Sequence, residues 1–80
     1  MINFSKHESG DDDFSIYKIG ECHYFGDGVE EDDEQAFAYF KSASELGSSQ
    51  ADHYLGLMHY VGRGCDQNKA KAFSYFTKAA

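Results

Sequence analysis

The sequence contains no proline and no tryptophan, and only two of its 80 residues are cysteine. The absence of proline suits uninterrupted helices, because proline breaks the interior of a helix. Two cysteines do not make a disulfide framework, so Cys22 and Cys65 are expected to be buried, reduced thiols. No segment approaches the ~20 apolar residues of a membrane span, and the N-terminus has no apolar run typical of a signal peptide. We therefore expect a cytoplasmic protein.

Basic residues are also scarce: seven Lys and Arg stand against 14 Asp and Glu, and the net charge is −7 at pH 7. Affinity for nucleic acid normally comes from clustered Lys and Arg, and an anionic membrane surface repels an acidic protein. A basic protein would be attracted, mainly through faster encounter. The composition therefore favours a protein partner, with a basic one suited to the charge, over nucleic acid or a membrane.

An internal repeat is the strongest pattern in the chain. A shift of 36 residues aligns residues 19–28 with 55–64 and residues 36–43 with 72–79. Ten of the thirty positions aligned between Ser15 and Ser44 are identical, and most are glycine, alanine or aromatic residues, which set backbone shape and packing. Such self-similarity indicates a repeat architecture in which neighbouring units bury a shared core.

The first copy reads as two helices separated by glycine residues. The first helix follows the acidic residues 11–13, which suit a helix N-terminus, and ends before Gly26 and Gly28. The second begins after Asp32, an expected N-cap whose capping-box-like partner is Gln35, and stops at Gly47. The residues that helical spacing places on the buried faces are Ile16, Ile19, Gly20, His23, Ala36, Tyr39, Phe40 and Ala43.

The second copy repeats this arrangement. Ser49 is expected to cap its first helix, Gly62 and Gly64 to end that helix, and Asn68 to cap the second. Small residues at matching positions let neighbouring helices approach closely, while aromatic rings fill the space between them. The small residues are Gly20, Gly56, Ala36, Ala43, Ala72 and Ala79, and the rings are Tyr39, Phe40, Tyr75 and Phe76.

These residues resemble the pattern of the Sel-one-like repeats, a family related to the tetratricopeptide repeats. That pattern runs Leu-Gly-x-x-Tyr-x-x-Gly-x-Gly-Val-x-x-Asp-x-x-x-Ala-x-x-Trp/Tyr-Tyr/Phe-x-x-Ala-Ala-x-x-Gly. The first copy matches at Gly20, Gly26, Gly28, Val29, Asp32, Ala36, Tyr39, Phe40, Ala43 and Gly47. The second matches at Leu55, Gly56, Gly62, Gly64, Ala72, Tyr75, Phe76, Ala79 and Ala80.

The resemblance covers residues 14–80 and implies an all-α fold. We expect an α-α superhelix, a short solenoid of two tandem helix-turn-helix hairpins like those of tetratricopeptide repeats, with repeats at about 14–48 and 49–80. Residues 1–13 are expected to form a polar, flexible segment before them.

For function, the resemblance implies an adaptor or scaffold that binds a protein partner. In tetratricopeptide-like arrays the first helix of each hairpin lines the concave face. The residues of those helices that would face a partner are Tyr17, Glu21, Tyr24, His53, Leu57 and Tyr60. Tyrosine suits an interface because it adds contact area and a hydroxyl at low entropic cost. The alternative is that Tyr24 and Tyr60 pack between the hairpins.

His23 and His59 stand where the family pattern has tyrosine. A metal site would recruit Cys22 or Cys65, but no His-x-x-x-His or Cys-x-x-Cys pair supports it, and zinc needs its ligands ~2 Å from a common centre. The favoured interpretation is that each imidazole replaces a tyrosine ring in packing. The acidic residues 27–34 lack the spacing of a calcium-binding EF-hand loop and read as a solvated loop with a helix cap. No catalytic or phosphate-binding motif occurs, so we expect neither an enzyme nor a cofactor.

Two repeats are few for a solenoid, which generally needs about three repeats or polar caps. The last helix is expected to leave an apolar edge open. Three alternatives follow: the chain is a fragment of a longer scaffold, it self-associates through this edge, or a partner stabilises it. One specific version of the binding role is a small acidic inhibitor or immunity protein that neutralises a basic toxin or enzyme.

Overall fold

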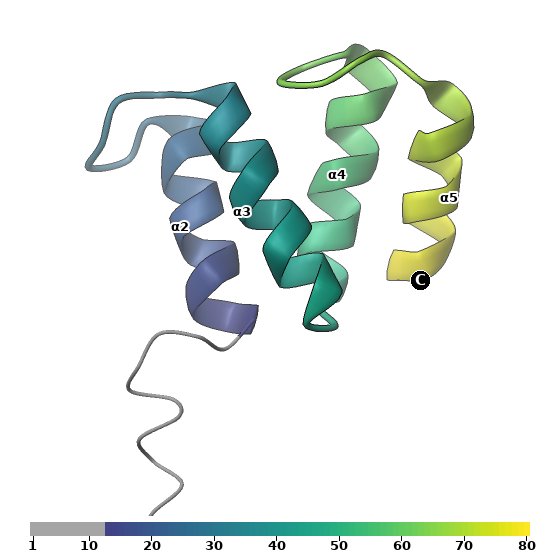
Figure 1. Ribbon diagram of the computed structural model, residues 1–80, viewed down its shortest axis with the longest axis horizontal. Helices are drawn as coiled ribbons and strands as arrows, with labels where there is room; N and C mark the ends of the chain where they lie inside the picture. The colour runs from purple at the N-terminus through teal and green to yellow at the C-terminus, as the bar shows by residue number, and fades with distance from the viewer. Residues whose placement is uncertain (1–12) are drawn as a thin grey trace, which may run out of the picture.

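A computed structural model describes residues 13–80, which form four α-helices joined by turns (Figure 1). The helices are α2 (Asp13–Phe25), α3 (Asp33–Glu45), α4 (Ser49–Val61) and α5 (Lys69–Ala79). No strand occurs in this part of the chain, so the predicted all-α fold is confirmed. The predicted flexible segment lies outside the described residues, except for Asp13, which begins α2.

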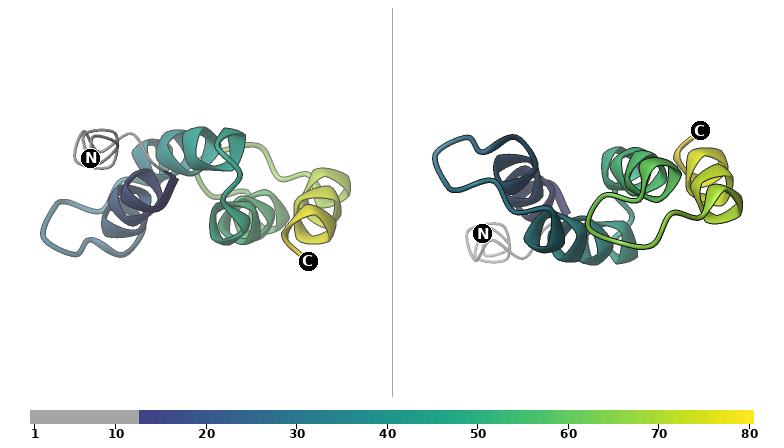
Figure 2. Two further views of the ribbon diagram at one scale, coloured as in Figure 1. Left: turned by 90° about the horizontal axis from the view of Figure 1, so that it is seen from below. Right: turned by 90° about the horizontal axis from the view of Figure 1, so that it is seen from above.

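The four helices form two antiparallel hairpins that stack side by side. Helix α2 packs against α3 and α4 packs against α5, while contacts between α3 and α4 join the hairpins. In Figure 1 the helices follow one another across the molecule in chain order, and both views of Figure 2 place α2 and α4 on the same side of α3. This is the α-α superhelix that the repeat predicts.

Side-chain caps begin α3 and α5 where the sequence predicts them. The Asp32 Oδ1 atom accepts hydrogen bonds from two backbone N–H groups, including that of Gln35 at 3.1 Å. The Asn68 Oδ1 atom accepts one from the Lys71 N–H at 3.0 Å. The capping-box-like pair acts in one direction, because the N–H of Asp32 itself donates to the His23 carbonyl oxygen at 2.9 Å.

The cap of α4 is Ser48, so the prediction of Ser49 was wrong. Ser48 has the extended backbone of an N-cap (φ −78°, ψ 115°), and its Oγ accepts the Ala51 N–H at 3.1 Å. Gly47, whose φ is +99°, turns the chain immediately before this position. Ser49 is already the first helical residue, and its side chain is exposed. Two adjacent serines were equal candidates in the sequence, and the backbone angles decided between them.

The core pairs small residues of one helix with large residues of the next. The largest fully buried side chains are Phe40, Leu55 and Met58. A Cβ atom added to Gly20 would lie 2.9 Å from ring carbons of Phe40, and one added to Gly56 would lie 2.5 Å from a ring carbon of Phe76. The predicted close approach at the two repeat-equivalent glycines is therefore confirmed.

Ile19 departs from its predicted burial, since 40% of its surface is exposed while its repeat equivalent Leu55 is fully buried. The cause is the number of neighbours that each helix has. Helix α4 lies between α3 and α5, whereas α2 packs chiefly against α3. The prediction for Ile19 was wrong because the sequence pattern treats both copies alike, although only one of them has a helix on each side.

A polar contact joins three helices beside the turn between α3 and α4. Ser44 of α3 donates a hydrogen bond to Asp52 of α4. Lys78 of α5 donates from Nζ to the Ser44 Oγ at 3.2 Å, and its Nζ lies 3.8 Å from the Asp52 Oδ1. These partners stabilise the Asp52 carboxylate, which is buried.

Candidate partner-binding surface

A cluster of tyrosine side chains joins α2 to α4. It consists of Tyr17, Tyr24 and Tyr54, and we call it the tyrosine cluster. The Tyr54 ring stacks on Phe40 of α3 (centroids 4.8 Å apart, planes at 3°), and it lies 5.9 Å from the Tyr17 ring and 5.1 Å from the Tyr24 ring. Tyr54 thus fills the space between the first helices of the two hairpins, over the buried face of α3.

Glu21 lies at the polar end of the tyrosine cluster. Its Oε2 accepts hydrogen bonds from the hydroxyls of Tyr17 (2.9 Å) and Tyr54 (3.1 Å), and its Oε1 accepts one from the Lys18 ammonium (2.8 Å). The bond from Lys18 is the main cause that lowers the pKa of Glu21, against an opposing effect of burial. Burial and the bond to Glu21 raise the pKa of Tyr17. At neutral pH, Glu21 is therefore an ionised carboxylate beside the neutral phenols of Tyr17 and Tyr54.

Arg63 clamps the two hairpins together. It lies in the turn after α4, and its guanidinium donates to the Asp33 Oδ1, the Glu31 Oε2 and the Tyr24 carbonyl oxygen, each at 2.8 Å. The same group lies 3.9 Å from the centroid of the Tyr24 ring. Sequence reasoning missed this clamp. The available signal was the change from Asp27 in the first copy to arginine in the second, next to the acidic run of the first copy.

The six predicted partner-binding residues fall into two groups in the structure. Tyr17 is 9% exposed, and Glu21 and Tyr24 are half-buried, so these three form part of the junction between the hairpins. The alternative that Tyr24 packs between hairpins is confirmed by its contacts with Tyr54 and Arg63.

The other three residues lie on α4, and the ring contacts of His53 and Tyr60 are within their own hairpin. The His53 ring is exposed and lies 5.8 Å from that of Phe76, and Leu57 is half-buried. Tyr60 is 42% exposed and lies 6.5 Å from Phe73, with the Lys69 ammonium 5.5 Å from its ring centroid. The role of all six in partner binding stays a prediction.

Both unusual histidines pack as rings. His23 stacks on Tyr39 (5.4 Å, planes at 15°), and His59 stacks on Tyr75 (5.6 Å, planes at 6°). Each also donates from Nδ1 to a backbone carbonyl oxygen, that of Ile19 and that of Asp66 respectively. The interpretation that each imidazole replaces a tyrosine ring in packing is confirmed. Tyr39, predicted to be buried, is half-buried under this stack.

The two cysteines are free thiols and are half-buried, whereas buried thiols were predicted. Burial raises the pKa of Cys65. Between residues 13 and 80, no three His, Cys, Asp or Glu side chains are grouped as a metal ion would require. In the acidic run, Asp32 caps α3 and two of its neighbours bind Arg63, as in a solvated loop with a helix cap.

Several large apolar side chains of the four helices are exposed. Phe25 at the end of α2 is 60% exposed, and Phe73 on α5 is 58% exposed. Sequence reasoning had no signal for Phe25, because its repeat equivalent is Val61 rather than a ring. No helix from Asp13 to Ala79 combines the length and apolar character needed to cross a membrane.

Two stacked hairpins with glycine-mediated close approach define an α-helical repeat protein. The family model described as Sel1 repeat matches the chain twice, over residues 14–48 and 49–80. The chain therefore belongs to the Sel1 repeat family, whose members generally mediate protein–protein interactions on a fold that is typically non-catalytic.

Solved structures of Sel1-like proteins superpose closely on this chain. A Sel1 repeat protein from Oxalobacter formigenes is 29% identical with a TM-score of 0.84, and the match covers 86% of this chain and 28% of that one. The protein c5321, a protective antigen of uropathogenic Escherichia coli, is 33% identical with a TM-score of 0.81, covering 84% and 14%. Helicobacter pylori cysteine rich protein B is 27% identical with a TM-score of 0.79, covering 84% and 50%. This chain thus spans half or less of each of these proteins. Comparison with curated proteins found no match.

Proposed function

We propose that this chain is an interaction module whose partner binds at the end of α2, around Phe25. The observation that supports this most directly is the 60% exposure of the Phe25 ring beside a fixed neighbour. Tyr24 holds Phe25 in an edge-to-face contact at 4.9 Å, and Arg63 in turn holds Tyr24. An exposed ring on a rigid support is typical of residues that dominate binding energy, because little ordering entropy is lost on association.

The charge beside Phe25 favours a basic partner. Asp27, Glu30 and Glu34 are exposed, and no ion pair with a described residue neutralises them. Such unpaired carboxylates would speed encounter with a positively charged surface and would be screened by salt. A small acidic inhibitor or immunity protein that binds a basic enzyme or toxin one-to-one is the specific version that these features support.

The test compares two equally exposed phenylalanines. Affinity capture from the source organism, followed by mass spectrometry, would use the wild-type chain, Phe25→Ser and the control Phe73→Ser as baits. We expect a partner that the wild type and Phe73→Ser retain and that Phe25→Ser loses. Retention by Phe25→Ser, or equal loss in both variants, would show that the partner does not bind at this end of α2.

Titration calorimetry with the purified partner then tests the charge. Affinity should fall as salt rises, and the double replacement of Asp27 and Glu30 by their amides should flatten that dependence. An affinity that is independent of salt in the wild type would contradict a basic partner.

The outer face of α5 favours a second candidate, self-association. Phe73 is 58% exposed, whereas its repeat equivalent Phe37 packs with its edge toward His59 of the next helix (5.5 Å). A second copy could cover Phe73 as α4 covers Phe37. Sedimentation velocity should then show a concentration-dependent dimer or larger species that Phe73→Ser abolishes. A wild-type monomer at all concentrations would exclude it.

A further inference from the structure

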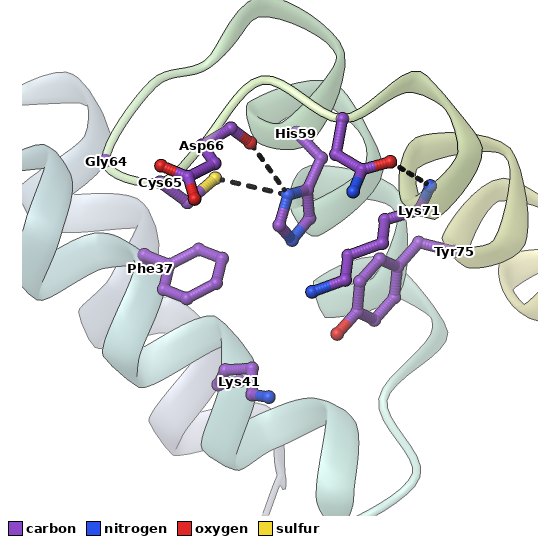
Figure 3. A pocket seen from close by; sticks show the side chains of 9 residues that line it. Phe37, Lys41, His59, Gly64, Cys65, Asp66, Lys71 and Tyr75 are labelled. Carbon is purple, nitrogen blue, oxygen red and sulfur yellow. Dashed lines mark hydrogen bonds between the residues drawn. The ribbon is translucent and has the colours of Figure 1, made fainter.

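A pocket of about 450 Å³ opens between α3 and α5, over α4 (Figure 3). Its position mirrors that of the tyrosine cluster, which lies between α2 and α4 over α3, but here no tyrosine fills the space. Phe37 and Lys41 come from α3, Lys71 and Tyr75 from α5, and His59 from α4. The turn that follows α4 forms the rim. The volume is in the range that holds a small organic molecule.

Two lysines, Lys41 and Lys71, give the pocket a positive charge. Among the basic side chains of residues 13–80, Lys18, Arg63 and Lys78 form ion pairs, and Lys69 lies over the Tyr60 ring. The remaining two, Lys41 and Lys71, form no ion pair with a described residue, and both line this pocket. In Figure 3 the Lys71 ammonium lies beside the Tyr75 ring, and Lys41 borders the same space from α3.

His59 presents a hydrogen-bond acceptor at the floor of the pocket. When Nδ1 carries the proton of the neutral ring, it donates to the Asp66 carbonyl oxygen at 3.2 Å, and the Cys65 Sγ lies 3.5 Å from the same atom. The Nε2 atom then has a free lone pair. Among the described residues, every fully buried side-chain nitrogen and oxygen has a hydrogen-bond partner. The His59 Nε2 has no such partner, so it is not fully buried and is accessible from the pocket that His59 lines. A ligand hydroxyl or protonated phosphate oxygen could donate to it.

The walls are apolar where they flank His59. The Phe37 ring meets the imidazole edge-on at 5.5 Å, and the Tyr75 ring stacks on it at 5.6 Å, so all three rings are fixed. One acidic side chain, Asp66, also lines the pocket, and in Figure 3 it lies on the side opposite Lys71. Two lysines and one aspartate leave a net charge of +1 at this site, against −7 for the chain.

From this arrangement we propose that the pocket between α3 and α5 binds a small organic anion, a carboxylate or phosphate carried on a flat apolar body. The anionic group binds Lys41 and Lys71, and the apolar body lies against Phe37 and Tyr75. The interaction surface at Phe25 involves none of these groups. This site is therefore independent of the proposed partner, and either can fail without the other.

The experiment titrates the full chain with four probes: phenyl phosphate, benzoate, inorganic phosphate and uncharged benzyl alcohol. Binding is followed by calorimetry and by the amide shifts of Phe37, Gly64 and Tyr75 in NMR spectra. We expect phenyl phosphate, benzoate or both to bind and to shift these amides, and the stronger of the two identifies the anionic group. Inorganic phosphate and benzyl alcohol should bind at least about ten-fold more weakly, because each lacks one half of the ligand.

Variants separate the site from general electrostatics. The double variant Lys41→Gln, Lys71→Gln should weaken binding at least about ten-fold. Lys69→Gln removes one lysine charge two residues from Lys71 but outside the pocket, and should leave affinity within about two-fold. Asp66→Asn should tighten binding. All four positions are exposed or half-exposed, and unchanged thermal melts would show that the variants fold.

Three outcomes would overturn the proposal. The first is that neither aryl anion binds, and the second is that Lys69→Gln weakens binding as much as the pocket variant does. The third is that inorganic phosphate binds as tightly as phenyl phosphate, which would mean an adventitious ion only.

Discussion

The replacement Gly56→Ala is expected to destabilise the protein, although alanine favours a helix over glycine by about 1 kcal/mol. The new Cβ would lie 2.5 and 2.7 Å from ring carbons of Phe76 and 3.1 Å from the Ala72 carbonyl oxygen. Carbon atoms in contact prefer about 3.5–4.0 Å, so the ring and α5 must retreat by roughly 1 Å. Overpacking of this kind costs about 1–3 kcal/mol.

The upper part of that range applies, because a backbone oxygen as well as a ring opposes the added methyl group. After the helix-propensity gain is subtracted, the free energy of unfolding should fall by about 1–2 kcal/mol. In a domain of this size that lowers the melting temperature by about 4–8 °C for each kcal/mol.

Urea denaturation followed by circular dichroism measures this effect against two controls. Ala38→Gly, at an exposed position of α3, gives the Ala–Gly difference without a clash and should cost about 1 kcal/mol. Adding Phe76→Leu to Gly56→Ala should recover part of the loss, with a coupling energy of about 0.5–3 kcal/mol. If Gly56→Ala instead stabilised the protein by about 1 kcal/mol, the close approach of α4 and α5 would be refuted.

Three further predictions concern the clamp, the buried phenol and the α4 cap. Arg63→Met should lower the free energy of unfolding by about 1–2 kcal/mol at low salt and by less at high salt. The control Lys18→Met removes one exposed ion pair and should change the free energy of unfolding by less than about 0.5 kcal/mol. Equal losses of the two variants in urea denaturation would contradict the role of Arg63 in joining the hairpins. Burial raises the pKa of Tyr17 above its usual 10.0, so the neutral phenol stabilises the folded state. This contribution is complete below about pH 10 and is lost as the pH rises above that value. Stability measured from about pH 9 to 11 should therefore decline, and less steeply in Tyr17→Phe; identical slopes would show that Tyr17 is not responsible. Ser48→Ala should cost about 1 kcal/mol in thermal melts and Ser49→Ala close to none, and the reverse order would place the cap at Ser49.

Sequence periodicity was most reliable where a residue's role depends on its own helix or turn. Asp32 and Asn68 cap helices through bonds that span at most three residues, so their types and spacing were sufficient to predict them. Gly62 ends α4 in a left-handed conformation for the same reason. The prediction failed at Ser49, where two adjacent residues of the same type differ only in backbone angles.

Periodicity was least reliable at the junction between the hairpins. Tyr17 lies in the core against Tyr54, a residue 37 positions away, and periodicity gave no sign of this contact; its predicted role in partner binding stays a prediction. A helical wheel gives the angle between two side chains on one helix but not which neighbouring helix covers them. The same limit hid the pocket between α3 and α5, whose lining comes from three helices and a turn.

The sequence by itself determined that this chain is an all-α repeat of two hairpins, because glycine, alanine and ring positions recur every 36 residues and act through local backbone shape and close packing. Only the tertiary structure decided which surfaces are free. It buried Tyr17, left Phe25 and Phe73 exposed, and brought Lys41 and Lys71 to one pocket. The physical reason is that exposure depends on how many helices pack against each face, and equivalent residues in the two repeats have different neighbours.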